Sequence, residues 1–361
     1  MGTDLYRSPC LPWLEPVGEE SDVVLASRVR LARNLGKVPF PSRADVYQLA
    51  AVKKTASAAL PSIEKAMGQM FDALDIDEIA PLERETLCAK YLISRNLAKE
   101  PEQRAAFISD DRSMSIMVNE EDHLRILCMA PGLNLDRPLD MAFRVDDVIG
   151  ERLDMAFDEK LGYLTSWPTN LGTGLQCSVL LHLPGLVFTD NIGSIIHISQ
   201  RLGLQMKSVF TSGNEAVGNL FRLSNQLSLG LSEQEILTNV RGAVVEIASH
   251  ERRVRTALEL HQKDLLEDYV WRAYGELSYA RRMRSANALN LMSKLRLGID
   301  LGIVDVAAPG FFPELIVANR EGYLKNLAGK PDLSKEEIYR MRANIIRQTI
   351  LRYTVPRRHR P

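Results

Sequence analysis

Alternating apolar and polar residues predict strands in several parts of the chain. Side chains alternate between the two sides of a strand, so residues two apart share a face. Within residues 21–34, one face is predicted to hold Val23, Leu25, Ser27, Val29 and Leu31. Arg28 and Arg30 then project together from the other face. The same pattern predicts further strands at residues 114–118, 175–183 and 204–210.

Apolar residues at intervals of three and four predict helices elsewhere. This spacing runs through residues 43–67, 77–98, 139–157, 191–203 and 236–277. Pro61 is predicted to interrupt the first of these helices. Ser334 and Glu337 form an N-terminal capping signal, so a last helix is predicted at residues 335–352. From Leu220 onward the chain is predicted to be mostly helical.

Three consecutive acids, Glu120, Glu121 and Asp122, follow the predicted strand at residues 114–118. Neighbouring carboxylates repel one another, so the fold must supply them with cations or water. One interpretation is a solvated turn, which spacing alone favours. The other is a site that receives a cation, and a planar guanidinium suits a carboxylate fork well.

Other polar features leave similar choices open. Arg28 and Arg30 could hold an oligophosphate, or they could cover a solvated sheet face. The loop containing Asn170, Gly172 and Gly174 could bring backbone N–H groups close to a phosphate, or it could simply turn the chain. His182, on the predicted strand that follows, could be a ligand or a packed histidine.

Composition narrows the class of protein. The chain has 361 residues, of which 45% are hydrophobic and 25% charged, which is ordinary for a globular protein of one or two domains. The formal net charge of −1 indicates no nucleic-acid or membrane partner. The four cysteines form no CxxC pair, and no secretion signal or apolar run of 18 residues occurs. These features predict a cytoplasmic protein with reduced thiols.

Five motifs follow one another along the chain: ASRVRLARN (26–34), VNEEDHLRI (118–126), DEKLGYLTSWPTNLGTGLQCSVLLHLP (158–184), EAVGNLFRLSNQLSLG (215–230) and RLGIDLGIV (296–304). In this order they resemble the ATP:guanidino phosphotransferases, or phosphagen kinases. Among these, the bacterial protein-arginine kinases are the most similar branch. The resemblance implies an α+β fold, in which helices flank an antiparallel sheet and an all-α domain follows. It places a catalytic domain at residues 1–255 and a helical C-terminal domain at residues 256–361.

The resemblance also implies an activity, namely transfer of phosphate from ATP, with Mg²⁺, to the guanidinium of arginine. Glu121 matches the carboxylate that binds the guanidinium and helps to take its proton, with Glu120 beside it. A base is needed because a free guanidinium stays protonated in water. Positions that match the nucleotide-binding residues are Ser27, Arg28, Arg30, Arg125, Gln176, Ser178, His182 and Lys207.

Four of the matched positions depart from the family pattern. Gln176 and Lys207 stand where arginines usually hold phosphates, and Ser212 stands where the branch has a second guanidinium-binding glutamate. Trp167 replaces a cysteine beside the guanidinium. The alternative to an active kinase is therefore a catalytically impaired relative that acts as a binding or regulatory subunit. The expected partners are ATP or ADP, an arginine-containing protein, a second copy of the chain and an adaptor protein.

Overall fold

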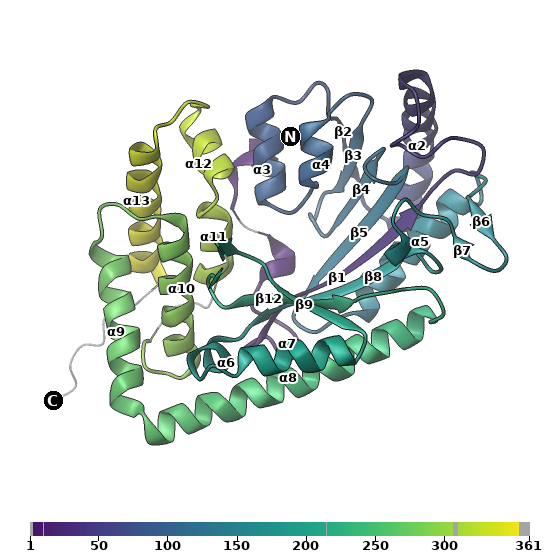
Figure 1. The fold of residues 1–361 in the computed structure, drawn as a ribbon. Helices are drawn as coiled ribbons and strands as arrows, with labels where there is room; N and C mark the ends of the chain where they lie inside the picture. The colour runs from purple at the N-terminus through teal and green to yellow at the C-terminus, as the bar shows by residue number, and fades with distance from the viewer. Residues whose placement is uncertain (1–2, 10, 214, 306–309, 354–361) are drawn as a thin grey trace.

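The computed structural model describes residues 3–9, 11–213, 215–305 and 310–353. Its centre is an antiparallel sheet of eight strands in the order β2-β3-β4-β5-β1-β8-β12-β9 (Figure 1). The strands are β1 (Val24–Arg33), β2 (Phe71–Asp75), β3 (Ala105–Ser109), β4 (Met114–Val118), β5 (Leu124–Pro131), β8 (Leu175–His182), β9 (Leu204–Ser208) and β12 (Leu220–Asn225). Two short hairpins lie outside it, β6 (Phe157–Asp158) with β7 (Gly162–Tyr163), and β10 (Thr211–Ser212) with β11 (Glu215–Ala216). The predicted fold class is confirmed.

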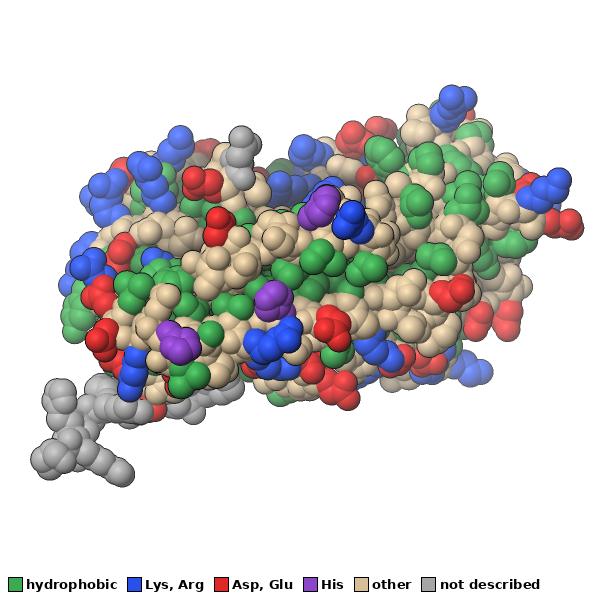
Figure 2. Space-filling model, turned by 60° about the horizontal axis from the view of Figure 1, so that its bottom comes forward, with side chains coloured by type: hydrophobic (Ala, Val, Ile, Leu, Met, Phe, Trp, Pro, Cys, Tyr) green, Lys and Arg blue, Asp and Glu red, His purple; other side chains and the backbone are tan. Residues whose placement is uncertain are grey.

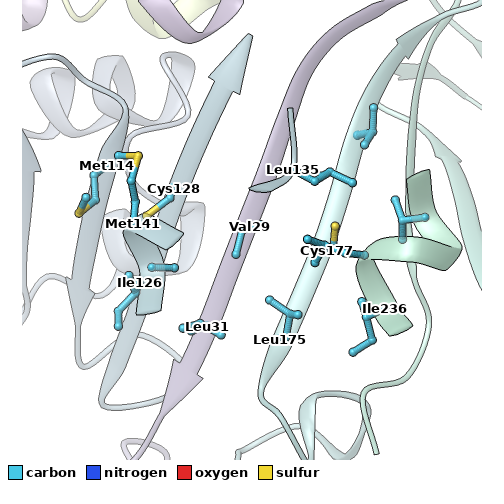
Figure 3. Close-up of a cluster of buried hydrophobic side chains, with 14 of the residues drawn as sticks. Val29, Leu31, Met114, Ile126, Cys128, Leu135, Met141, Leu175, Cys177 and Ile236 are labelled. Atoms are coloured by element: carbon cyan, nitrogen blue, oxygen red, sulfur yellow. The ribbon is translucent and has the colours of Figure 1, made fainter. Parts of the chain in front are cut away.

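One face of the sheet packs on four helices through a continuous apolar core. These helices are α2 (Val46–Met67), α5 (Asp136–Gly150), α7 (Ile192–Arg201) and α8 (Glu233–His261). Figure 3 shows Val29 and Leu31 of β1 on this side, beside Cys128 of β5 and Cys177 of β8. The apolar half of each alternating strand therefore anchors the sheet.

The opposite face is covered only in part. The shorter helices here are α1 (Thr3–Arg7), η1 (Pro12–Leu14), α3 (Pro81–Ala89), α4 (Arg95–Lys99) and η2 (Pro168–Asn170), whereas α6 (Pro184–Phe188) packs on α8 and contributes Leu186 to the first cluster. The C-terminal helices are α9 (Lys263–Tyr279), α10 (Ser285–Asp300), α11 (Phe311–Ala318), α12 (Glu321–Ala328) and α13 (Lys335–Tyr353). A second apolar cluster joins this face to the C-terminal helices, and it includes Leu127, Met129, Leu220, Leu289 and Phe312.

A buried ion-pair network fastens α8 to its surroundings. Glu251 accepts hydrogen bonds from the backbone N–H groups of Gly185 and Leu186, and from Nε of Arg255 at 2.7 Å. Arg255 also lies 3.4 Å from a carboxylate oxygen of Asp300 on α10. Since a buried charge without a partner is costly, these residues hold α6, α8 and α10 in one arrangement.

Several predicted elements differ from the observed ones. Residues 220–225 form strand β12 rather than helix, and the edge strand β2 was not predicted. The helix predicted at 139–157 ends at Gly150, and α2 continues through Pro61 without a break. In β1 the pairing register shifts between Val24 and Ala26, so Leu25 belongs to the second cluster instead of sharing a face with Val29. Such an irregularity turns the side chains beside it out of the strict alternation, while Val23 stays in the first cluster with Val29.

The outer surface carries charges of both signs. Figure 2 shows acidic and basic side chains interspersed with hydrophobic ones on the face viewed there. Within the described part of the chain, no helix is both long and apolar enough to span a membrane.

Candidate active site

The acid cluster forms the turn between β4 and β5, and its three carboxylates have different environments. Glu120 is buried, and it accepts hydrogen bonds from Oγ of Ser94 at 2.5 Å and from Nη1 of Arg125 at 2.6 Å. Asp122 is buried too, and it accepts from Nδ2 of Asn34 at 2.6 Å. The solvated-turn interpretation is therefore wrong for these two acids.

Glu121 is the partly exposed acid of the three. Its side chain is 29% exposed, and one oxygen accepts a hydrogen bond from Nδ2 of Asn96 at 3.0 Å. Its second oxygen lies 3.8 Å from Nη1 of Arg125, beyond hydrogen-bond distance. The two buried neighbours fix the turn, which leaves Glu121 free to receive a cation.

Burial and nearby charges act in opposite directions on Glu120. Burial alone would raise the pKa of this carboxyl, but the charge of Arg125 and the hydrogen bond from Ser94 hold the pKa below its ordinary value. Glu120 is therefore ionised at neutral pH. It positions Arg125 and is not itself available to a substrate.

The arginines lie beside this turn on the partly covered face of the sheet. On β1, Arg28 and Arg30 alternate with the core residues Val29 and Leu31, as predicted. Arg125 on β5 pairs with Ala32 of β1 and so projects from the same face. The sheet brings together the four residues Glu121, Arg28, Arg30 and Arg125, which come from chain segments about 90 residues apart.

These arginines are crowded enough to affect one another. Desolvation and the charges of Arg125, Arg222 and Arg30 lower the pKa of Arg28 well below its ordinary value. Burial and the charge of Arg125 lower the pKa of Arg30 to about 9. Nη2 of Arg30 donates to Oδ1 of Asn170 at 3.0 Å, while its buried Nε has no partner among the described residues. Such a cluster of cations is stabilised by an anion.

A cavity of about 700 Å³ opens on this face. Its lining residues come from the sheet, from helices α3 and α4, and from the C-terminal helices α12 and α13. Figure 1 shows α12 beside α3. Its walls carry two acids, Glu85 and Glu321, against the basic residues Arg28, Arg84, Arg95, Lys99, Arg125, Arg222, Arg320 and Arg342. The excess of guanidinium groups fits a polyanionic ligand such as a nucleotide polyphosphate.

Three more predicted nucleotide-binding residues extend this face across the sheet. Gln176 pairs with Arg30, and Ser178 pairs with Arg28, in the register of β1 and β8. Lys207 is exposed on β9. Gln176 carries no charge, so this part of the face has hydrogen-bonding capacity but no cation at that position.

Two further predicted nucleotide contacts lie away from the cavity. His182 is fully buried, and its Nε2 lies 2.8 Å from Oγ of Ser293 while its ring packs on Phe312. Burial lowers its pKa well below the ordinary value, so this is a neutral, packed histidine. Ser27 is buried on the opposite side of β1 from Arg28, where its Oγ donates to the carbonyl of Gly132.

The predicted guanidinium pocket is brought together only in part. Ser166 donates from Oγ to the carbonyl of Glu121 at 2.6 Å, which fastens the loop of Trp167 to the acid turn. Trp167 itself is 53% exposed, so its ring does not fill the pocket in this structure. Ser212 is exposed on the β10–β11 hairpin, where it pairs with Glu215.

The two glycines of the loop at residues 170–174 lie close against the backbone of neighbouring segments. A Cβ on Gly174 would come within 2.6 Å of the carbonyl oxygen of Ala32, and one on Gly172 within 2.9 Å of the Cα of Leu229. Both glycines have positive φ, so the loop turns the chain tightly against its own sheet. The turn interpretation is therefore confirmed, and approach of the loop's backbone N–H groups to a phosphate stays a prediction.

Sequence reasoning missed Arg222, which lines the cavity with Arg28 and Arg125. A helix is predicted from Leu220 onward, and a helical assignment hides which residues share a sheet face. Read as a strand, Leu220, Arg222 and Ser224 alternate with the buried Phe221 and Leu223, which is the signal that would have found it.

Two family descriptions match the chain. Residues 51–254 match "ATP:guanido phosphotransferase, C-terminal catalytic domain", and residues 263–360 match "Protein-arginine kinase McsB C-terminal domain". The protein-arginine kinase of Desulforamulus reducens is 43% identical over 352 residues, covering 96% of this chain and 97% of the relative. That of Brevibacillus brevis is 41% identical over 344 residues, covering 95% and 96%.

Solved structures agree in fold. Lombricine kinase superposes with a TM-score of 0.57 at 21% identity, over 70% of this chain and 73% of that one. The duplicated taurocyamine kinase of Schistosoma mansoni, with bound transition-state analogue components, gives a TM-score of 0.59 at 19% identity. That match covers 91% of this chain and 50% of the duplicated one. These likenesses establish the fold alone.

Proposed function

Because the chain belongs to the ATP:guanido phosphotransferase family, and within it to the protein-arginine kinases, we propose that it transfers the γ-phosphoryl group of ATP to arginine side chains in proteins. The observation that carries this proposal is the juxtaposition of the open carboxylate of Glu121 with Arg28, Arg30 and Arg125 on one sheet face. A carboxylate that can receive a guanidinium lies next to cations that can receive phosphates.

In the proposed reaction, Glu121 binds the acceptor guanidinium and takes one of its N–H protons. The freed nitrogen lone pair then attacks the γ-phosphorus, the P–O bond to ADP breaks, and the products are phosphoarginine and ADP. The acceptor must lose this proton as it reacts, because guanidinium pKa values exceed 12 in water. Glu120 and Asp122 hold the turn, so that Glu121 meets the acceptor in a fixed position.

The cations neutralise charge on the nucleotide. Arg28, Arg30, Arg125 and Lys207 are proposed to bind phosphate oxygens, which stabilises the transition state without covalent chemistry. No three metal-binding side chains converge within the described residues. This is compatible with Mg²⁺ bound mainly by phosphate oxygens and water, as it commonly is in phosphoryl transfer.

Further parts of the proposal concern organisation and location. We propose a catalytic part at residues 1–255 and a helical C-terminal part at 256–361, a boundary that falls inside α8.

Helix α9 exposes Leu265, Trp271 and Tyr279, which supports contact with a second copy of the chain or with an adaptor protein. Cys88, Cys128 and Cys177 are unpaired thiols, which supports a cytoplasmic location.

The test is transfer of labelled γ-phosphate from Mg·ATP to an arginine-rich protein, compared between the wild-type chain and Glu121→Gln. The reaction is quenched and analysed at neutral pH, because the phosphoramidate P–N bond is labile in acid. Label that is acid-labile and depends on Glu121 supports the proposal.

Absence of label, beside an active protein-arginine kinase under the same conditions, would favour the binding-subunit alternative. The departures at Gln176, Lys207 and Ser212 motivate that alternative. Binding of Mg·ADP without transfer would then identify a nucleotide-binding but silent relative.

A further inference from the structure

The position of Arg222 is electrostatically unfavourable unless the side chain binds an anion. In the register of β9 and β12 it lies directly opposite Lys207, and in that of β8 and β12 it lies opposite Leu180. Like charges directly opposite each other on one face destabilise a sheet. An anion bound between the two cations removes this repulsion.

No described residue neutralises Arg222. The ion pairs and hydrogen bonds of the described residues include none to its guanidinium, nor to that of Arg28. By contrast, Arg33 is paired with Asp146 at 2.6 Å and Arg296 with Asp300 at 2.6 Å, and both of these arginines are buried, whereas Arg222 is exposed. Glu85 and Glu321 also line the cavity, but neither is ion-paired with Arg222 or Arg28 among the described residues.

Arg222 also lies close enough to the predicted phosphate-binding residues to share one ligand with them. Partial desolvation in the cavity and the charge of Arg125 lower the pKa of Arg222, and its own charge contributes to the lowered pKa of Arg28. All three side chains line the same cavity. A small monovalent anion would meet one of them, whereas a polyphosphate can meet several.

We propose that Arg222 is a further contact for the polyphosphate of ATP. Its positive charge would compensate for the neutral side chain of Gln176 at the same site. The inference rests on the function proposed above. The occupant is the nucleotide rather than the acceptor, because an arginine acceptor is itself a cation and would be repelled. A guanidinium suits phosphate because its planar N–H groups can donate two parallel hydrogen bonds.

The experiment is calorimetric titration of the full-length chain with Mg·ADP, which needs no turnover. Arg222→Gln removes the charge, and Arg222→Lys keeps it but loses the planar fork. The matched control is Arg201→Gln, which removes an exposed arginine at the end of α7, on the other side of the sheet. Thermal midpoints of all variants establish that each is folded.

The expected Kd for Mg·ADP rises about tenfold or more in Arg222→Gln, by about threefold in Arg222→Lys, and by less than about twofold in Arg201→Gln. The thermal midpoint of Arg222→Gln without nucleotide stays the same or rises, because the repulsion from Lys207 is gone. An unchanged Kd for Arg222→Gln overturns the inference, as does a wild-type chain that does not bind Mg·ADP. A wild-type chain that binds Mg·ADP but transfers no phosphate refutes the proposed function, and the ratio of Kd values still decides the role of Arg222.

Discussion

The two faces of the central sheet are built from the same strands but differ in what they contain. On β1, Val29 and Leu31 pack into the apolar core, while Arg28 and Arg30 occupy the alternate positions on the opposite face, where Arg28 lines the cavity. Burial raises the pKa of the Cys177 thiol on the core face to about 12, so it stays protonated and inert. One face is thus held by apolar packing, which lets the other face carry cations that repel one another.

The largest effect is expected from Glu121→Gln, which alters the acid turn between β4 and β5 and leaves the apolar face unchanged. Glutamine keeps the shape but cannot accept the guanidinium proton, so kcat should fall by about 10²–10⁴-fold. The Kd for Mg·ADP and the thermal midpoint should stay near those of the wild-type chain, since Glu121 is partly exposed. Radiolabel transfer and calorimetry measure the two quantities. A variant that retains a tenth of the wild-type rate would remove Glu121 from the role of base.

Leu31→Ala should produce the opposite pattern. Leu31 is fully buried in the apolar core, so its truncation should cost about 3 kcal/mol of unfolding free energy, measured in urea. The Kd for Mg·ADP of the folded variant should change by less than about twofold. If nucleotide affinity collapses while stability is kept, the separation of the two faces is wrong.

Glu120→Gln tests the buried ion pair that supports the acid turn. Removing one partner should cost about 2 kcal/mol at pH 7, because Arg125 loses its nearest carboxylate. The folded-state pKa of Glu120 lies below its unfolded value, so its stabilisation is present above the unfolded pKa and is lost as the pH falls through the folded pKa. Chemical unfolding of both chains between pH 7 and pH 3 should therefore give curves that converge on acidification. A difference that grows in acid would contradict this assignment.

The smallest effect is a gain from Gln176→Arg. A cation opposite Arg30 on β8 should raise kcat/KM for ATP by about threefold to tenfold if it reaches a phosphate. Gln176→Met, which is similar in size but uncharged, is the control. The gain should be larger in an Arg222→Gln background, because the two arginines would supply charge to one ligand.

Several parts of the fold and the site were predictable from alternation and family motifs, including β1, β8, α13 and the shared face of Arg28 and Arg30. The environment of the acid turn was not, because Asn34 and Ser94 reach it from distant parts of the chain. Ser27 was placed with the arginines by its motif, although strand geometry directs neighbouring residues to opposite faces.

Residues 220–225 show a second reason why sequence periodicity did not predict the whole fold. The segment is short and buried on both sides apart from Arg222, so its six residues gave too little periodicity to separate strand from helix. The bulge near Val24 is a third case, because an irregular register depends on the partner strand.

The second apolar cluster has a practical consequence for anyone expressing fragments of this protein. A recombinant fragment ending at residue 255 would lack Leu289 and Phe312, which cover Met129 and Leu220 on the sheet. It would also separate Arg255 from Asp300. Such a fragment would expose apolar surface and aggregate during expression. Binding and turnover are therefore best studied on the intact polypeptide.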